Sequence, residues 1–129
     1  MNIGVESYDG TTLTVRAPLA PNRNLHGTAF AGSLFSAAAL TGWGALWLAF
    51  REHELSGLIV LADSQIQYRK AVSGDLVCRC TPDAGALDTG LAQFRSTRRL
   101  RLALVCTLDV GDKRAVDFTG TYVAHPERH

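Results

Sequence analysis

A long stretch without charged side chains limits what this chain can fold into. Between Arg23 and Arg51, residues 24 to 50 contain no Asp, Glu, Lys or Arg. About 20 apolar residues can span a bilayer as a helix, so the stretch is either a membrane span or a helix inside a soluble domain. Trp43 and Trp47 lie in its middle and C-terminal part rather than in two interfacial belts. Its many small residues suit close packing, so we predict a central helix buried on all sides and no membrane span.

The overall composition narrows the class of protein. The 129 residues are 47% apolar and 19% charged, and 13 Lys and Arg against 12 Asp and Glu give a formal net charge of +1. This fits one domain, residues 1–129, and argues against nucleic acid as a partner, which needs a basic excess. The N-terminal residues lack a basic region followed by an apolar one, so we expect no signal peptide and a cytoplasmic protein. We expect the three cysteines to be small core residues, since an odd number argues against a disulfide framework.

Alternating apolar residues and turn signals predict about six strands and one full helix. Two short strands flank the Asp9-Gly10 turn. A helix is expected over about 28–54, capped by Thr28 or a neighbour and ended by Gly57. The expected strands are 3–8, 11–17, 58–69, 76–81, 100–110 and 115–124, with a loop at 83–90 and a short helical turn at 91–98. One full helix among six strands favours an α+β fold in which an antiparallel sheet wraps the helix.

Two sequence segments resemble those of hotdog-fold acyl thioesterases. Residues 24–34 read Asn-Leu-His-Gly-Thr-Ala-Phe-Ala-Gly-Ser-Leu, and residues 68–75 read Tyr-Arg-Lys-Ala-Val-Ser-Gly-Asp. The chain is most similar to the YiiD C-terminal-like thioesterase domain, which occurs alone or fused behind an acetyltransferase. The resemblance implies a hotdog fold, a homodimer or homotetramer with sites shared between subunits, and hydrolysis of acyl-CoA or acyl-carrier-protein thioesters. It implies no separate cofactor, because coenzyme A or phosphopantetheine is part of the substrate.

The start of the central helix is the expected thioester site. Free backbone N–H groups and the positive end of the helix dipole lie there, so the N–H groups of Ala31 and Gly32 are expected to stabilise the oxyanion of a tetrahedral intermediate. The expected substrate-binding residues are Gly27, Thr28, Phe30, Arg69 and Lys70. Four more arginines are either a patch for coenzyme A or an acidic carrier protein, or a solvated face: Arg95, Arg98, Arg99 and Arg101.

The sequence offers two candidates for the base that activates water, His26 and Asp63. Many members of the resembling family carry His where this chain has Phe30, and Asp or Glu where it has Ala39. His26 is a candidate because a histidine imidazole is suited by its chemistry to general-base catalysis; the alternative is an ordinary loop histidine. Asn24 is expected to position the water or the carbonyl; the alternative is a residue that closes an Asx turn.

Asp63 is the second candidate base. Alternation along its strand places Asp63 with Leu61 and Gln65 on the face that points away from the helix, while Val60 and Ser64 face the helix. In the resembling family the outward face meets the partner subunit and the active site. The alternative is a solvated strand residue.

Two other functions compete with thioester hydrolysis. The missing helix carboxylate fits a non-catalytic acyl-CoA or fatty-acyl binding module of the same fold. A hotdog hydratase or dehydratase would use an Asp–His or His–Asp/Glu pair in another motif, which this sequence lacks. No metal site is expected, because Gly57 stands at the second His position of the His-Glu-x-x-His pattern that His53-Glu54 would begin.

Overall fold

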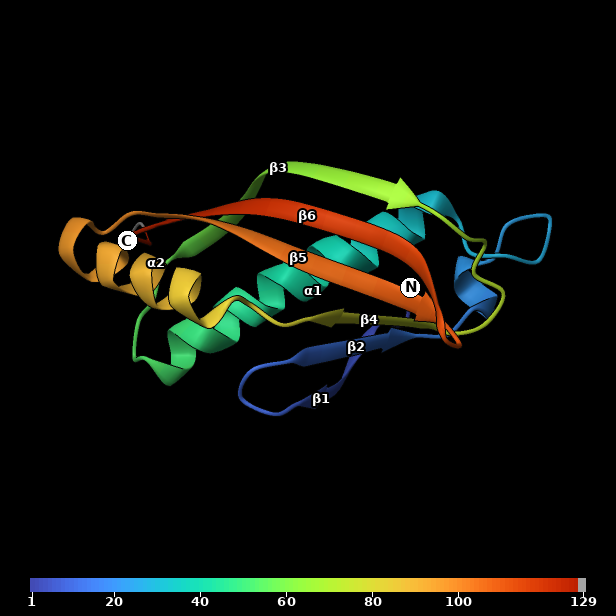
Figure 1. The fold of residues 1–129 in the computed structure, drawn as a ribbon, viewed down its shortest axis with the longest axis horizontal. Coiled ribbons are helices and arrows are strands. Elements are labelled where there is room, and N and C mark those ends of the chain that lie inside the picture. Colours follow the sequence, from blue (N-terminus) through green and yellow to red (C-terminus); the bar gives the residue numbers. More distant parts are fainter. Residues whose placement is uncertain (128–129) are drawn as a thin grey trace.

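A six-stranded antiparallel sheet curls around one long helix (Figure 1). The computed structural model describes residues 1–127. The sheet has the strand order β1-β2-β4-β5-β6-β3. The strands are β1 (Gly4–Tyr8), β2 (Leu13–Ala17), β3 (Leu58–Tyr68), β4 (Leu76–Cys80), β5 (Leu100–Val110) and β6 (Lys113–His125). The helices are α1 (Ala31–Glu52) and α2 (Ala84–Thr97), and a 3-10 turn covers Ala20–Asn22. This confirms the predicted α+β hotdog architecture; the predicted domain, 1–129, extends past the described residues at 128 and 129.

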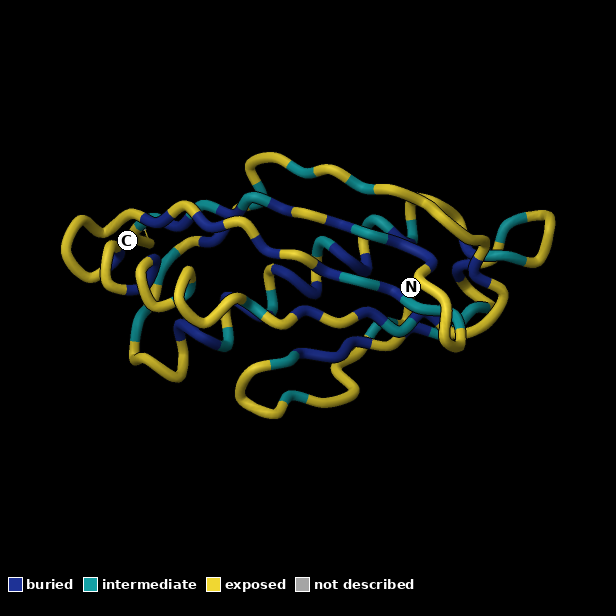
Figure 2. Tube along the Cα trace, in the orientation of Figure 1, coloured by how far each residue is buried: buried dark blue, intermediate teal, exposed yellow. Residues whose placement is uncertain are grey.

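The uncharged stretch forms α1, the core helix of the fold. By length and composition α1 would be able to cross a membrane, but half of its most apolar window is buried inside the fold. The buried residues are Leu34, Ala37, Ala38, Thr41, Gly42, Ala45, Leu46, Ala49 and Phe50. The prediction of burial on all sides is wrong, because the sheet edges β1 and β3 are not joined over the helix (Figures 1 and 2). This leaves an exposed line of residues, which we call the open stripe: Gly32, Ser36, Leu40, Trp43, Trp47 and Arg51.

Both predicted caps of the central helix are wrong. Phe30 occupies the N-cap position, without a side-chain cap, and Thr28 bonds instead within the preceding loop. The helix ends at His53, whose N–H bonds to the Ala49 carbonyl. Gly57 lies further along, where an added Cβ would be 3.0 Å from Phe94 Cζ. Gly57 therefore permits close packing rather than ending the helix.

The predicted loop at 83–90 is wrong, because those residues begin α2. Asp83 caps this helix by accepting a hydrogen bond from the Ala86 N–H at 2.9 Å. Leu91 and Phe94 bury their side chains against the body, and the Phe94 ring packs on Phe50 with centroids 4.9 Å apart. Gly90 faces Leu100, whose Cδ1 would lie 3.0 Å from an added Cβ. Gly90, one of the glycines that suggested a loop, thus permits close packing of the helix on β5.

A β-bulge divides β3 into two halves whose faces are exchanged. The register with β6 shifts between Leu61 and Asp63. Leu61 therefore packs on the core and Val60 is 43% exposed, the reverse of the prediction. Beyond the bulge, Ser64 is half-buried and Asp63 is exposed, as predicted. The prediction assumed unbroken alternation along β3, whereas the bulge adds one residue that has no partner in the register with β6.

The three cysteines are core residues, as predicted. Cys78 and Cys80 on β4 and Cys106 on β5 are each at most 1% exposed, and Cys80 lies opposite Cys106 in the strand register. All three are free thiols. Hydrogen bonds with the Cys78 and Cys80 thiols, together with burial, raise the pKa of Cys106, so this thiol stays neutral at ordinary pH.

A hydrogen bond between Tyr8 and Glu52 joins the ends of β1 and α1. We predict that its loss destabilises the protein at high pH. Tyr8 Oη donates to the Glu52 carboxylate, and burial, this bond and the charges of Glu52 and Asp9 raise the pKa of Tyr8 from 10.0 to about 12. Because the folded-state pKa is raised, the stabilisation is complete below pH 10 and is lost as the pH rises towards 12. We expect the free energy of unfolding, measured with urea, to decline less over this pH range in Tyr8→Phe than in the parent protein. Equal declines in the two proteins would contradict this.

Candidate functional site

A surface pocket lies where α1 begins, and we call it the mouth pocket. It has a volume of about 330 Å³ and combines the loop before α1, the first turn of α1 and the segment after β3. Its lining residues are Asn24, Thr28, Ala29, Ala31, Leu34, Tyr68, Arg69, Lys70, Ala71 and Val72. Of the predicted site residues, the structure thus brings together Asn24, Thr28, Ala31, Arg69 and Lys70.

Backbone contacts from two distant segments hold the start of α1 in place. The Ala29 N–H donates to the Val72 carbonyl and the Phe30 N–H donates to the Asn22 carbonyl, both at 2.8 Å. Asn22 is buried, and its Nδ2 donates to the carbonyls of Met1 and Pro18. The helix start is therefore tied both to the N-terminal residues and to the segment after β3.

The first turn of α1 carries N–H groups that the described part of the protein leaves free. The first helical bond runs from the Leu34 N–H to the Phe30 carbonyl at 3.0 Å, and no side chain caps the helix. Among residues 1–127, no group accepts a hydrogen bond from the N–H of Ala31, Gly32 or Ser33. An added Cβ at Gly32 would meet nothing within 4 Å, so this end of the helix is open to a ligand. Free N–H groups and the helix dipole together favour a negatively charged oxygen here.

Asn24 folds the loop before α1. Its Oδ1 accepts hydrogen bonds from the N–H groups of His26 at 2.9 Å and Thr28 at 3.1 Å, and its Nδ2 donates to Thr28 Oγ1 at 3.0 Å. This is the Asx-type geometry that was the alternative to a role in positioning water. The Asn24 amide borders the mouth pocket while its polar atoms hold the loop.

His26 and Gly27 lie near the tip of this loop, outside the mouth pocket. The loop stands away from the body of the molecule at the right-hand end of Figure 1. His26 is exposed, and Gly27 adopts a φ of 78°, which glycine tolerates at no steric cost. Phe30 is also exposed, just before the first helical residue. A single chain therefore does not bring the His26 side chain into the lining of the pocket.

Asp63 is separated from the mouth pocket along β3. Its carboxylate is exposed and accepts a hydrogen bond from the Ser64 N–H at 2.8 Å. Tyr68, at the pocket, comes five positions after Asp63 along β3, which corresponds to roughly 16 Å of strand. Asp63 of one chain is therefore too far away to act on a carbonyl held at Ala31 of the same chain.

The two basic residues of the pocket differ in their partners. Arg69 Nε donates to the Asp117 carboxylate, and its Nη2 donates to Gln67 Oε1 at 2.6 Å. The hydrogen bonds of Arg69 and Arg114 to Asp117 lower the pKa of that carboxyl group. No carboxylate among the described residues lies within 4.0 Å of the Lys70 ammonium. Lys70 is thus the cation left available for a phosphate or an acidic partner.

Sequence reasoning missed two side chains and one N–H group at this site. Tyr68 Oη donates to the Ala31 carbonyl at 3.2 Å, which links the end of β3 to the first turn of α1. Its place in the 68–75 motif was a usable signal. The buried Asn22 and the free N–H of Ser33 had no local signal, because both depend on contacts across the fold.

The family of the protein follows from comparison with known proteins. A family model described as "Putative thioesterase (yiiD_Cterm)" matches residues 1–126. The chain belongs to this family. The prediction made from the two sequence segments is therefore confirmed, as is the prediction of an enzyme of the thioester hydrolase class.

Solved structures agree with this yiiD_Cterm membership. A "putative thioesterase" from Shewanella oneidensis is 36% identical, with a TM-score of 0.85 over 98% of this chain and 85% of the other. A protein of unknown function from Chlorobaculum tepidum is 31% identical, with a TM-score of 0.92 over 98% and 84%. A thioesterase from Haemophilus influenzae is 16% identical, with a TM-score of 0.76 over 98% and 81%, and shows the fold alone.

Proposed function

We propose that the protein hydrolyses acyl thioesters of coenzyme A or of acyl carrier protein at the mouth pocket. The observation that carries this proposal is the set of free N–H groups at Ala31, Gly32 and Ser33, which open beside a pocket in a thioesterase-family fold. Those of Ala31 and Gly32 stabilise the oxyanion that forms when water adds to the thioester carbonyl. A base takes the proton of the water, the C–S bond then breaks, and the thiolate leaves with the coenzyme A or phosphopantetheine. The protein needs no other cofactor for these steps.

The binding roles follow from where the side chains lie. Lys70, with Arg69 behind it, receives the phosphates of coenzyme A or an acidic face of the carrier protein. The loop at Gly27 and Thr28 and the exposed ring of Phe30 border the entering substrate. The substrate is thus a small acyl thioester or an acyl carrier protein. We expect the protein to work in the cytoplasm.

A second copy of the chain completes the site in this proposal. β3 is a long edge strand of eleven residues, and an uncovered edge offers unpaired N–H and C=O groups to another strand. Pairing through β3 gives a homodimer, or a homotetramer built from two such pairs. The base, His26 or Asp63, and the Asn24 that positions the water then need not all come from one chain.

Hydrolysis of a synthetic acyl-CoA panel is the direct test. A thiol-reactive dye reports release of coenzyme A, and we expect turnover above the uncatalysed rate with at least one chain length. The folded state and the assembly are checked in the same sample by circular dichroism and sedimentation. No thiol release with any member of the panel, from folded protein, would overturn the proposal.

A double variant, His26→Ala with Asp63→Ala, tests the base. General-base catalysis contributes about 10²- to 10⁴-fold, so we expect kcat to fall by this factor while the fold is retained, because both side chains are exposed. The two single variants then show which residue is responsible. Gln65→Ala, an exposed neighbour on β3, is the matched control and should keep full activity. Unchanged turnover in the double variant would refute both assignments and leave the activity standing.

A specific observation favours the second candidate, an acyl-binding module without catalysis. None of the ten residues that line the mouth pocket is Asp, Glu or His. A single chain therefore presents no carboxylate or imidazole base to water at this place. Saturable binding of acyl-CoA without any thiol release would select this function over hydrolysis.

A further inference from the structure

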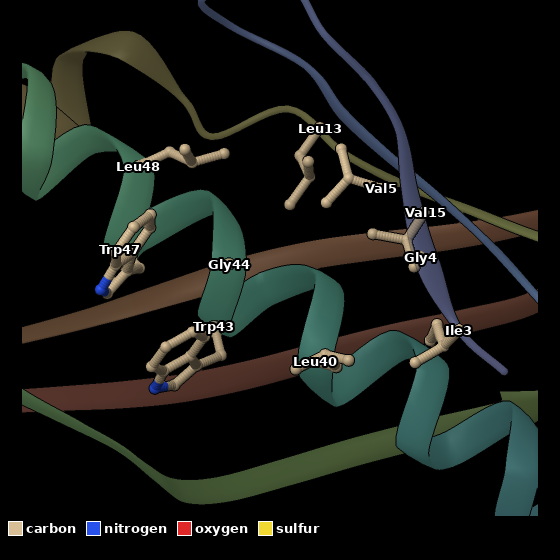
Figure 3. Close-up of a pocket in the computed structure, with 10 residues that line it drawn as sticks. All are labelled: Ile3, Gly4, Val5, Leu13, Val15, Leu40, Trp43, Gly44, Trp47 and Leu48. Atoms are coloured by element: carbon tan, nitrogen blue, oxygen red, sulfur yellow. The ribbon is translucent and has the colours of Figure 1, made fainter. Parts of the chain in front are cut away.

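A second cavity opens beside the middle of α1, and we call it the tryptophan groove (Figure 3). It has a volume of about 290 Å³ and lies between α1 and the first two strands. Leu40, Trp43 and Trp47 line it from the helix, and Ile3, Val5 and Leu13 face them from the residue before β1, from β1 and from β2. Every side chain that lines it is apolar, so the groove suits a hydrocarbon rather than a charged ligand.

Contacts within the protein hold the walls of the groove in place without a ligand. Trp43 Nε1 donates to the Ile59 carbonyl at 3.1 Å, so the polar end of this indole is satisfied. The Trp47 ring stacks on it with centroids 6.3 Å apart and an interplanar angle of 17°. Leu13 and Val15 at the floor are buried in the core. A ligand would therefore meet a preformed slot and would not have to order it.

The open stripe runs along α1 from its first turn to this groove, since Gly32 lies in the first turn and Leu40 lines the groove. Gly32, Ser36 and Leu40 follow one another at four-residue spacing, so they lie on one face of α1. Gly32 carries one of the proposed oxyanion N–H groups, and Ser36, between Gly32 and Leu40, is exposed. The axial distance from Gly32 to Leu40 is about 12 Å at 1.5 Å per residue.

We propose that the tryptophan groove binds the distal end of the acyl chain whose thioester lies at the start of α1, so that the protein selects long aliphatic acyl groups. This rests on the proposed function and names its substrate class. An extended chain advances about 1.2 Å per bond, so about ten bonds are needed to reach the groove from Gly32. Its volume of about 290 Å³ lies just below the range for small-molecule sites, about 300–1,000 Å³, which fits a chain end but not a whole coenzyme.

The length of the acyl chain decides whether it reaches the groove. Acyl chains too short to reach Leu40 leave the groove empty, so the groove does not strengthen their binding. Beyond about ten carbons, each methylene buried in the groove strengthens binding about fourfold, since burial of one CH₂ is worth about 0.8 kcal/mol. We therefore expect kcat/KM to be flat from butanoyl to octanoyl thioesters and to rise steeply to dodecanoyl and tetradecanoyl.

The two tryptophans provide a reporter that is independent of hydrolysis. They are the only tryptophans of the chain, and both line the groove. Dodecanoate should change the intrinsic fluorescence in a saturable way, and hexanoate should not at the same concentration. This measurement detects the chain in the groove even if the protein cleaves no thioester.

A pair of matched variants tests whether the preference for long acyl chains depends on the groove. Val5 is 68% exposed at the groove, and Val5→Phe narrows the slot without touching the core. We expect it to lower the ratio of kcat/KM for dodecanoyl to that for butanoyl thioester at least tenfold and to weaken the fluorescence response to dodecanoate. Val105→Phe makes the same change at a 54% exposed position on β5 outside the groove, and should leave both unchanged. Leu40→Glu, also exposed, should act like Val5→Phe by placing a charge in the slot.

The outcomes separate the two proposals. Saturable fluorescence changes with dodecanoate but no turnover would support the groove and refute hydrolysis. Turnover that is independent of chain length, without a fluorescence response, would overturn the groove and leave hydrolysis intact. If Leu40→Glu instead converts an oligomer to a monomer in sedimentation, the groove is a contact between copies of the chain and the acyl-binding proposal is wrong.

Discussion

Replacement of Ala31 by proline is expected to lower kcat for thioester hydrolysis about 10²- to 10³-fold, which is the usual cost of removing one oxyanion donor. Ala31 is the first residue of α1, and its N–H has no acceptor among residues 1–127. Phe30 before it has φ −61° and ψ 141°, the extended conformation that a residue before proline prefers. Proline is favoured at the first helical position, so the substitution removes one N–H group and leaves the helix in place.

The control is Ala31→Gly, which keeps the N–H and should retain most of the activity. Circular dichroism and thermal unfolding should show that both variants keep the helix and the fold. Steady-state kinetics with one acyl-CoA substrate then separate kcat from KM. Equal kcat values for the proline and glycine variants would show that the Ala31 N–H does not contact the oxyanion.

Gly42→Ala should destabilise the fold by several kcal/mol, although alanine is the better helix former. An added Cβ at Gly42 would lie 2.3 Å from Tyr122 Oη and 2.8 Å from two ring carbons. Tyr122 is fully buried, and its Oη donates to the Ala39 carbonyl at 2.6 Å, so the ring has no room to move aside. Overpacking costs about 1–3 kcal/mol, and loss of the buried hydrogen bond costs about 1–3 kcal/mol more. Urea unfolding at neutral pH measures the difference.

Two further substitutions show whether the close approach to Tyr122 is the cause. Gly85→Ala in α2 makes the same change where the nearest atom, Asp83 Oδ2, is 3.6 Å away, and should leave stability unchanged or raise it by up to about 1 kcal/mol. Adding Tyr122→Phe to Gly42→Ala removes the oxygen that lies nearest and should recover part of the loss. A Gly42→Ala protein as stable as the parent would show that the ring can move.

The central helix and the sheet were predictable because their signals are local. The stretch without charge at 24–50 favoured a helix in the core, and the alternation on either side of it favoured strands. The second half of α2 was predicted as a helical turn at 91–98, but its first half was missed because Gly85 and Gly90 read as loop residues. Leu91 and Phe94 hold the helix by packing on the body. The bulge after Leu61 was missed because it exists only in the pairing of β3 with β6. In both cases a contact with a distant segment outweighed the local pattern.

The candidate site was predictable in part. The motif residues Asn24, Thr28, Ala31, Arg69 and Lys70 gather at one pocket, since the two motifs adjoin the ends of α1 and β3. His26 and Asp63 were chosen for their chemistry, and a single chain places neither of them in that pocket. Their roles stay predictions that depend on the β3 edge and a second copy of the chain. Tyr68 and Asn22 act through hydrogen bonds to backbone far away in sequence.

By itself the sequence determined that an apolar helix would lie inside a curled antiparallel sheet, because burial of uncharged and alternating residues is a property of local pattern. It also determined the family, through two short motifs that the family model confirms over residues 1–126. The tertiary structure alone decided that one stripe of α1 stays open. The reason is that β1 and β3 are the unjoined edges of the sheet. The stretch without charge is therefore a core helix on one side and, at the tryptophan groove, an exposed apolar surface on the other.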